Sequence, residues 1–132
     1  MSNFCPFCRF QNTESDRAVI AENKHAFIVR DGFPVSEGHT LFIPKRHVGS
    51  FFEATEDERQ ALLQLLDQAK IDIETHYKPD AYNIGINDGL AAGQTVAHLH
   101  IHLIPRYEGQ AADPRGGVRW VVPEKADYWS AP

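Results

Sequence analysis

The chain has few cysteines, no long apolar run and no secretory signal pattern. Its 132 residues include only two cysteines, so a network of disulfides is excluded. No apolar run approaches the roughly 20 residues that cross a bilayer. No charged segment followed by an apolar stretch opens the sequence, which is what a secretory signal would require. The sequence therefore predicts a single cytoplasmic domain that buries a core of its own.

An excess of positive charge is also missing. Lysine and arginine together number 13 against 18 aspartates and glutamates, and the formal net charge is −5. Proteins that hold nucleic acid through its phosphates carry a surplus of basic side chains. We therefore expect neither nucleic acid nor a membrane among the partners, whereas a small anionic ligand held by local groups is compatible with this charge.

Hydrophobic periodicity predicts an α+β fold, a mostly antiparallel sheet of about five strands with one long helix. The helix should run from its cap, Thr55, to about His76, with Glu58 completing a capping box. The expected strands cover residues 18–20, 25–30, 39–44, 82–86 and 98–104, and residues 118–122 are expected as a further edge strand. No linker divides the chain, so residues 1–132 form one domain, with a core at 4–106 and a tail at 107–132.

Residues 98–104 carry a histidine at every second position, with aliphatic residues between them. In a strand, alternate side chains share a face, so His98, His100 and His102 should point to one side, about 6 to 7 Å apart. Imidazole can be a nucleophile, a proton carrier or a metal ligand near neutral pH. On the residues alone three interpretations stay open: a metal site, a nucleophilic centre and a solvated face without a task.

The context of these histidines resembles the histidine triad (HIT) superfamily of nucleotide hydrolases and transferases. Residues 87–89 and 93–106 resemble its signature, and residues 38–47 look like its earlier strand at the right distance along the chain. The resemblance covers roughly residues 4–106. It implies a HIT-like fold and a homodimer formed through the helix and an edge strand.

In that family the reaction is covalent and takes place at the α-phosphorus of a nucleotide. By resemblance the middle histidine, His100, would attack the phosphorus, expel the group beyond it and hold the nucleotidyl group until water releases the monophosphate. His102 would contact the phosphate and assist the leaving group, while His98 completes the triad and His39 supports it from the adjacent strand. No catalytic cofactor is required for this chemistry.

The resemblance also implies how a purine nucleotide is held. The implied nucleotide contacts are Val29, Asp31, Asn87, Gln94 and Thr95. Asp31 would accept hydrogen bonds from the ribose hydroxyls, whereas the amides and the threonine would meet phosphate or leaving-group atoms. Val29, together with Phe7, would line an apolar pocket for the base. Because Asp31 precedes glycine, it can instead simply make a turn.

Cys5 and Cys8 are separated by two residues, which in a cytoplasmic chain favours a metal or redox role over a structural disulfide. A tetrahedral zinc would need two further ligands. The resemblance to bacterial members with this motif implies that His47 and His98 supply them, forming a structural zinc site. The alternative is two free thiols. If zinc takes His98, then His100 and His102 remain available for catalysis.

Three functions stay open at this point. The first is a hydrolase of dinucleoside polyphosphates or nucleoside phosphoramidates, favoured because the transferase branch of the family usually replaces the third histidine. The second is a nucleotidyl transferase, and the third is a nonenzymatic nucleotide-binding or scaffold protein. In the tail, Arg115 and Arg119 could reach a polyphosphate or could simply be solvated.

Overall fold

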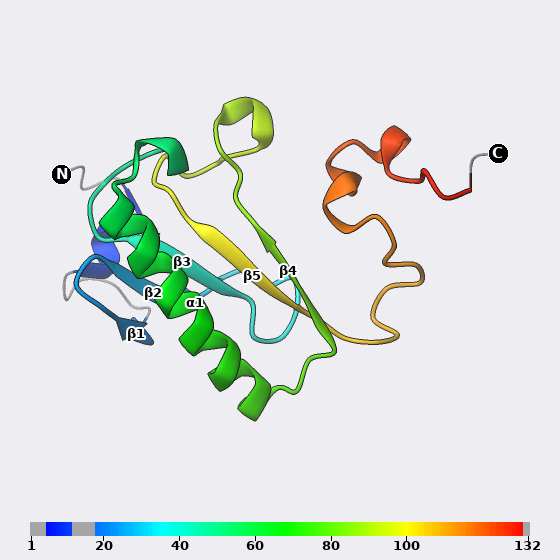
Figure 1. The fold of residues 1–132 in the computed structure, drawn as a ribbon, viewed down its shortest axis with the longest axis horizontal. Coiled ribbons are helices and arrows are strands. Elements are labelled where there is room, and N and C mark those ends of the chain that lie inside the picture. Colours follow the sequence, from blue (N-terminus) through cyan, green and yellow to red (C-terminus); the bar gives the residue numbers. More distant parts are fainter. Residues whose placement is uncertain (1–4, 12–17, 131–132) are drawn as a thin grey trace.

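The computed structural model describes residues 5–11 and 18–130, which form an antiparallel sheet with one long helix on one face (Figure 1). The strands are β1 (Ala21–Glu22), β2 (Ala26–Arg30), β3 (Thr40–Pro44), β4 (Ala81–Gly85) and β5 (Ile101–Arg106), and the helix is α1 (Glu56–His76). The spatial order β1-β2-β3-β5-β4 makes β3 and β5 neighbours in the middle of the sheet. This confirms the predicted α+β class. Among the described residues no helix is long and apolar enough to span a membrane.

The helix α1 begins where the capping pattern predicts. The Glu58 main-chain N–H donates to Thr55 Oγ1 at 3.1 Å, and the Thr55 N–H donates back to Glu58 Oε1 at 2.9 Å. These bonds satisfy two of the donors that a helix start leaves unpaired. The buried helix residues Ala61, Leu62, Leu65, Ala69 and Ile73 then pack on the sheet.

Glu58 also binds Arg46, which ties α1 to the segment after β3. The two side chains form a paired contact, with Arg46 Nε 2.9 Å from Oε2 and Arg46 Nη2 2.8 Å from Oε1. The Glu58 side chain is only 5% exposed. The hydrogen bonds from Arg46 lower the pKa of Glu58 to about 2, against the opposing effect of burial.

We expect Glu58→Gln to lower the free energy of unfolding at pH 7 by about 1 to 3 kcal/mol, because the uncharged amide loses the ion pair. A carboxylate with a depressed pKa stabilises the fold above its unfolded pKa, and this contribution is lost as pH falls through about 2. The difference between the two proteins should therefore shrink between pH 5 and pH 2 in urea unfolding. The control Glu56→Gln changes an exposed acid in the same turn. A pH-independent difference would contradict this account.

The sheet has two differently packed faces. Toward α1, the core includes Ile28, Phe42, Leu99, Ile101 and Leu103. On the opposite face a second cluster joins Phe27, Val29, Leu41 and Ile43 to the N-terminal residues Cys5, Phe7, Cys8 and Phe10. The N-terminal segment therefore covers the sheet face that α1 leaves open.

The first strand is displaced from its predicted place. The sequence predicts it at residues 18–20, but β1 is Ala21–Glu22 and pairs with β2. The Asn23 side chain explains the shift, because its Oδ1 accepts from the main-chain N–H groups of His25 and Ala26 at 3.2 and 2.9 Å. This local turn brings the residues immediately before it into the sheet.

The strand that carries the histidines begins later than predicted. The sequence predicts a start at residue 98, but β5 starts at Ile101, so only His102 of the three histidines lies within it. Before that point the main chain makes a different contact: the Leu99 N–H donates to the carbonyl of Val48 at 2.7 Å. His98 and His100 therefore sit on the approach to β5 and not in a regular ladder.

The edge strand predicted at residues 118–122 is wrong. That stretch forms a 3-10 turn, Gly117–Val121, followed by a second at Pro123–Lys125. Gly116 and Gly117 have φ values of 93° and 46°, in the left-handed region that extended strands do not use. The chain therefore coils at this point and lies beyond the β4 edge of the sheet (Figure 1).

Candidate active site and Cys/His cluster

The three histidines share the sheet face opposite α1, as the alternation predicts. Their aliphatic neighbours belong to the core under the helix. The ring centroids of His100 and His102 lie 5.0 Å apart, closer than the roughly 6 to 7 Å expected from an ideal strand. Phe7 stands edge-on against His98 and His100, with centroid distances of 5.9 and 4.8 Å.

His100 has one defined hydrogen-bonding state. Its Nδ1 lies 2.9 Å from the carbonyl oxygen of His98. A carbonyl can only accept, so Nδ1 carries the proton and Nε2 keeps its lone pair. Burial lowers the pKa of His100, although the bond to His98 and the charge of Asp31 oppose this, and the neutral imidazole is favoured. His100 therefore offers a nucleophilic nitrogen at neutral pH.

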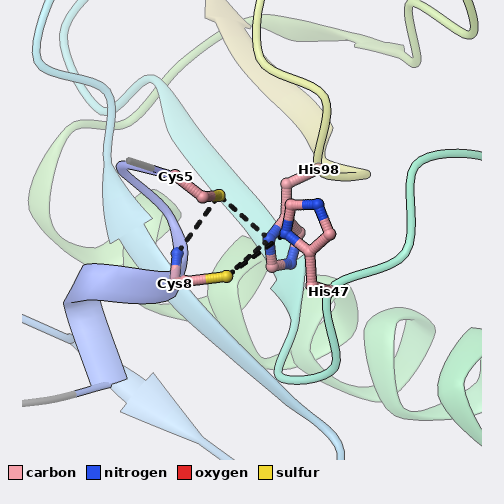
Figure 2. A group of neighbouring side chains, drawn as sticks. All are labelled: Cys5, Cys8, His47 and His98. Carbon is pink, nitrogen blue, oxygen red and sulfur yellow. Dashed lines mark hydrogen bonds between the residues drawn. The ribbon is translucent and has the colours of Figure 1, made fainter. Parts of the chain in front are cut away.

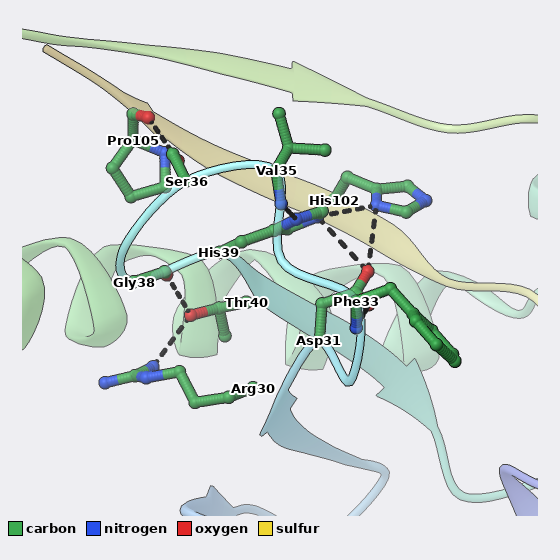
Figure 3. A network of polar contacts seen from close by, with 10 residues as sticks. All are labelled: Arg30, Asp31, Phe33, Val35, Ser36, Gly38, His39, Thr40, His102 and Pro105. Atoms are coloured by element: carbon green, nitrogen blue, oxygen red, sulfur yellow. Dashed lines mark hydrogen bonds and ion pairs between the residues drawn. The ribbon is translucent and has the colours of Figure 1, made fainter. Parts of the chain in front are cut away.

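The His102 side chain on β5 contacts the side chain of His39, which directly precedes β3 (Figure 3). His39 Nε2 and His102 Nδ1 are 2.9 Å apart, and His39 Nδ1 accepts from the main-chain N–H of Val35 at 3.0 Å. Burial and the neighbouring His100 and His39 lower the pKa of His102 to about 4. Burial also lowers the pKa of His39. Both rings are consequently neutral near pH 7.

Asp31 follows directly after β2 and makes two kinds of contact (Figure 3). Its Oδ1 accepts from the Phe33 N–H at 2.8 Å, the turn foreseen for an aspartate before glycine. Its Oδ2 lies 3.4 Å from His39 Nε2 and 3.9 Å from His102 Nδ1. The carboxylate therefore both orders its loop and faces the histidine pair.

A cavity of about 310 Å³ adjoins His39 and His102. Its walls include Asn87 from the loop after β4, Ile104 from β5, and Gly117 and Val118 from the tail. The family signature ends before the tail, so the motifs alone did not place Gly117 or Val118 beside the histidines. A group bound next to His102 would therefore be in contact with the tail.

The other residues predicted to contact the nucleotide differ in their exposure and in the contacts that they make. The Gln94 side chain serves the loop, because Nε2 donates to the carbonyls of Gly49 and Val96 at 2.9 and 3.1 Å while Oε1 accepts from Gly89 N–H at 2.8 Å. Thr95 is exposed beside it. Val29 is completely buried in the second cluster, beneath the N-terminal residues that include Phe7. Those N-terminal residues would have to move before Val29 could contact a base.

The two tail arginines are held by the tail itself. Arg115 pairs with Asp113 at 2.9 Å and stacks over the Trp129 ring at 4.7 Å. Arg119 donates to the carbonyls of Ala126 and Lys125 and lies over Tyr128. Neither of them lines the cavity beside His102. In this structure they stabilise the coil of the tail and do not face the histidines.

Cys5, Cys8, His47 and His98 come together as the family resemblance implies (Figure 2). Their sulfur and nitrogen atoms all lie within 4.8 Å of one another. Cys8 Sγ is 3.2 Å from His47 Nδ1 and 3.5 Å from His98 Nδ1, and Cys5 Sγ is 3.4 Å from His98 Nδ1. Neighbouring sulfur and nitrogen ligands of a tetrahedral zinc are about 3.5 Å apart, so this spacing fits the ion.

The hydrogen bonding of His98 also suits a metal ligand. Its Nε2 lies 2.8 Å from the Pro44 carbonyl and must donate to it, which leaves a lone pair on Nδ1 facing both sulfurs. Burial lowers the pKa of His98, favouring the neutral form. Burial and the adjacent Cys5 thiol raise the pKa of Cys8 to about 11. A bound cation would instead favour the thiolate form of Cys8.

These features define an α+β domain with a set of buried and partly buried histidines on one sheet face and a Cys2His2 cluster beside it. The HIT domain model matches residues 12–109, about three quarters of the sequence, and the chain belongs to the HIT family. A HIT family protein from Bacillus anthracis has the same fold, with a TM-score of 0.77 at 32% identity over 83% of this chain and 77% of that one. The resemblance of the histidine motifs to this family is thereby confirmed.

Relatives extend the comparison to other organisms. An uncharacterized HIT-like protein of Methanocaldococcus jannaschii is 41% identical over 80% of this chain and 81% of its own length. An adenylylsulfatase of Arabidopsis thaliana is 33% identical over 82% of this chain and 55% of its own length. An AP-4-A phosphorylase of Mycobacterium tuberculosis is 31% identical over 76% of this chain and 52% of its own length. A Zn-bound histidine triad family protein of Mycobacterium smegmatis has a TM-score of 0.75 at 30% identity, covering 83% and 80% of the two chains.

Proposed function

We propose that the chain is a nucleotide hydrolase that cleaves at the α-phosphorus through a nucleotidyl-histidine on His100. The observation that carries this proposal is the bond between His100 Nδ1 and the His98 carbonyl, which leaves the Nε2 lone pair free to attack. Family relatives named as an adenylylsulfatase and an AP-4-A phosphorylase support an adenylyl compound as the substrate. Dinucleoside polyphosphates and nucleoside phosphoramidates are therefore the first substrates to test.

The reaction divides one displacement into two. His100 Nε2 forms a bond to the α-phosphorus as the bond to the leaving group breaks, and that group departs with its electron pair. Water then attacks the same phosphorus, the P–N bond breaks, and AMP is released with His100 restored. His102 contacts the phosphate and the leaving group, consistent with its place beside the cavity of about 310 Å³.

The nucleotide is held by groups around this centre. Asn87, which lines the cavity, and the exposed Thr95 meet the phosphate, and Gln94 orders the loop between them. The ribose lies at Asp31, and a purine base lies toward the apolar cluster of Val29 and Phe7. This placement requires the N-terminal residues that pack over Val29 to move when the base binds.

Asp31→Asn is expected to raise KM about tenfold while changing kcat less, because a charged acceptor for two hydroxyls becomes a neutral amide. The amide oxygen can still accept from the Phe33 N–H, so the loop should stay ordered. Initial rates of AMP release give both constants. A substrate without ribose hydroxyls is the matched control and should show no KM difference. A fall in kcat at constant KM would remove Asp31 from the ribose role.

The Cys2His2 cluster is proposed to hold a structural zinc ion. Cys5, Cys8, His47 and His98 would be its ligands, and coordination of the ion would hold the N-terminal segment to the catalytic face. The Zn-bound relative and the spacing of the four donor atoms support this. With His98 committed to the cluster, catalysis falls to His100 and His102.

A homodimer is proposed as the functional unit. β4 is an edge strand of the five-stranded sheet, and Ile84 within it is 52% exposed. An exposed apolar edge is a surface on which a second copy can pair. Sedimentation of the purified chain would distinguish a dimer from a monomer.

A further inference from the structure

Asp31, His39 and His102 bring a carboxylate oxygen and two ring nitrogens within 4.8 Å of one another, a spacing that a metal ion could also use. The Val35 contact points to a different role. A His39 that binds metal through Nε2 must carry its proton on Nδ1, where the Val35 N–H already points at 3.0 Å. Two N–H groups would then oppose each other. The contacts favour a chain of hydrogen bonds without a metal.

The direction of that chain follows from its first bond. The Val35 main-chain N–H can only donate, so His39 Nδ1 accepts and the neutral ring carries its proton on Nε2. That proton faces His102 Nδ1 at 2.9 Å. His102 Nδ1 therefore accepts.

The other neutral tautomer of His102, with its proton on Nδ1, would have no hydrogen-bond acceptor. If His102 carried its proton on Nδ1, the nearest groups would be the protonated His39 Nε2 and Asp31 Oδ2. The second is 3.9 Å away, beyond hydrogen-bond reach. The proton of neutral His102 consequently stays on Nε2, the ring nitrogen that faces away from His39 (Figure 3).

We propose that the Val35 main-chain amide, acting through His39, fixes His102 as an Nε2–H donor, the tautomer opposite to that of His100. His100 then presents a lone pair to the α-phosphorus while His102 presents an N–H to the leaving atom. His39 is a positioning residue in this arrangement, and its effect reaches the substrate through His102. The tautomer follows from the contacts alone, whereas its kinetic consequence rests on the proposed hydrolase function.

Two substitutions of His39 separate this role from simple packing. The glutamine amide of His39→Gln can still donate toward His102 Nδ1, whereas His39→Leu fills a similar volume without a donor. Nitrogen NMR of ring-labelled protein reports which nitrogen of His102 is protonated. We expect Nε2–H alone in the natural protein and in His39→Gln, and a mixture of both tautomers in His39→Leu.

Kinetics supply the second measurement. An adenosine phosphoramidate has a leaving group that needs a donor, whereas the p-nitrophenyl ester of AMP does not. We expect His39→Leu to lower kcat at least tenfold more on the phosphoramidate than on the ester, and His39→Gln to restore most of that difference. Equal loss on both substrates, or equal behaviour of the two variants, would overturn the positioning role.

The two proposals fail in different ways. If the natural protein releases AMP from neither substrate, the hydrolase function fails, and the NMR result still decides the tautomer. If AMP is released but His102 carries its proton on Nδ1 in the natural protein, the hydrolase proposal survives and the tautomer proposal is overturned.

Discussion

Replacing His100 with alanine is expected to lower AMP release more than about 1,000-fold, because no other nitrogen offers a lone pair at the same place. Nucleotide binding should persist, since the proposed ribose and phosphate contacts lie on other residues. Release of AMP from diadenosine polyphosphates and adenosine phosphoramidates, with binding followed by calorimetry, measures both effects. His76→Ala, which removes an exposed histidine at the end of α1, is the matched control and should change neither.

Two results would contradict this expectation in different ways. AMP release by His100→Ala at the natural rate would show that another group attacks phosphorus. If the natural protein released no AMP from any substrate but bound nucleotides, the hydrolase would give way to the nucleotidyl transferase or the nonenzymatic binding protein. Adding sugar phosphates as acceptors separates those two.

Cys5→Ser is expected to abolish zinc binding and to lower Tm by about 10 °C. Losing a structural metal costs about 3 kcal/mol or more, and each kcal/mol shifts Tm by about 3 to 5 °C in a domain of this size. The buried N-terminal segment, which packs against Phe27 and Val29, loses its anchor at the same time. Metal analysis and thermal unfolding of the purified protein measure the two effects.

A pair of histidines provides the control for the metal site. His47→Ala removes a ligand and should reproduce the loss of zinc, whereas His25→Ala changes a histidine in the turn before β2 and should retain the ion. Treatment of the natural protein with a chelator should lower its Tm toward that of Cys5→Ser. Unchanged Tm and zinc content in Cys5→Ser would establish Cys5 and Cys8 as free thiols.

Those parts of the fold with strong local signals were predictable. The two capping hydrogen bonds between Thr55 and Glu58 made the start of α1 predictable, because both form within four residues. The central strand at residues 39–44 was predicted from Gly38 and Pro44 at its two ends, and the shared face of the three histidines followed from alternation. The Cys/His cluster was predicted through the family resemblance, and the chain brings all four donors together.

Other features depend on contacts that no local pattern encodes. Residues 118–122 are mostly apolar, as in an edge strand, but two glycines with positive φ coil the tail, and Trp120 donates to the Arg115 carbonyl within that coil. The role of Val35 is carried by its main-chain N–H, which every residue except proline possesses. The sequence therefore contains no signal for it, and only the position of His39 reveals the bond.

The most direct test of a covalent His100 intermediate is the stereochemistry at phosphorus. Each in-line displacement inverts the phosphorus, so attack by His100 followed by attack of water predicts overall retention. A substrate with a chiral α-thiophosphate, hydrolysed in water enriched in oxygen-18, reports the outcome without any need to isolate the intermediate. Retention of configuration in the released nucleoside phosphorothioate is the result we predict. Inversion would mean a single attack by water and would contradict the nucleotidyl-histidine.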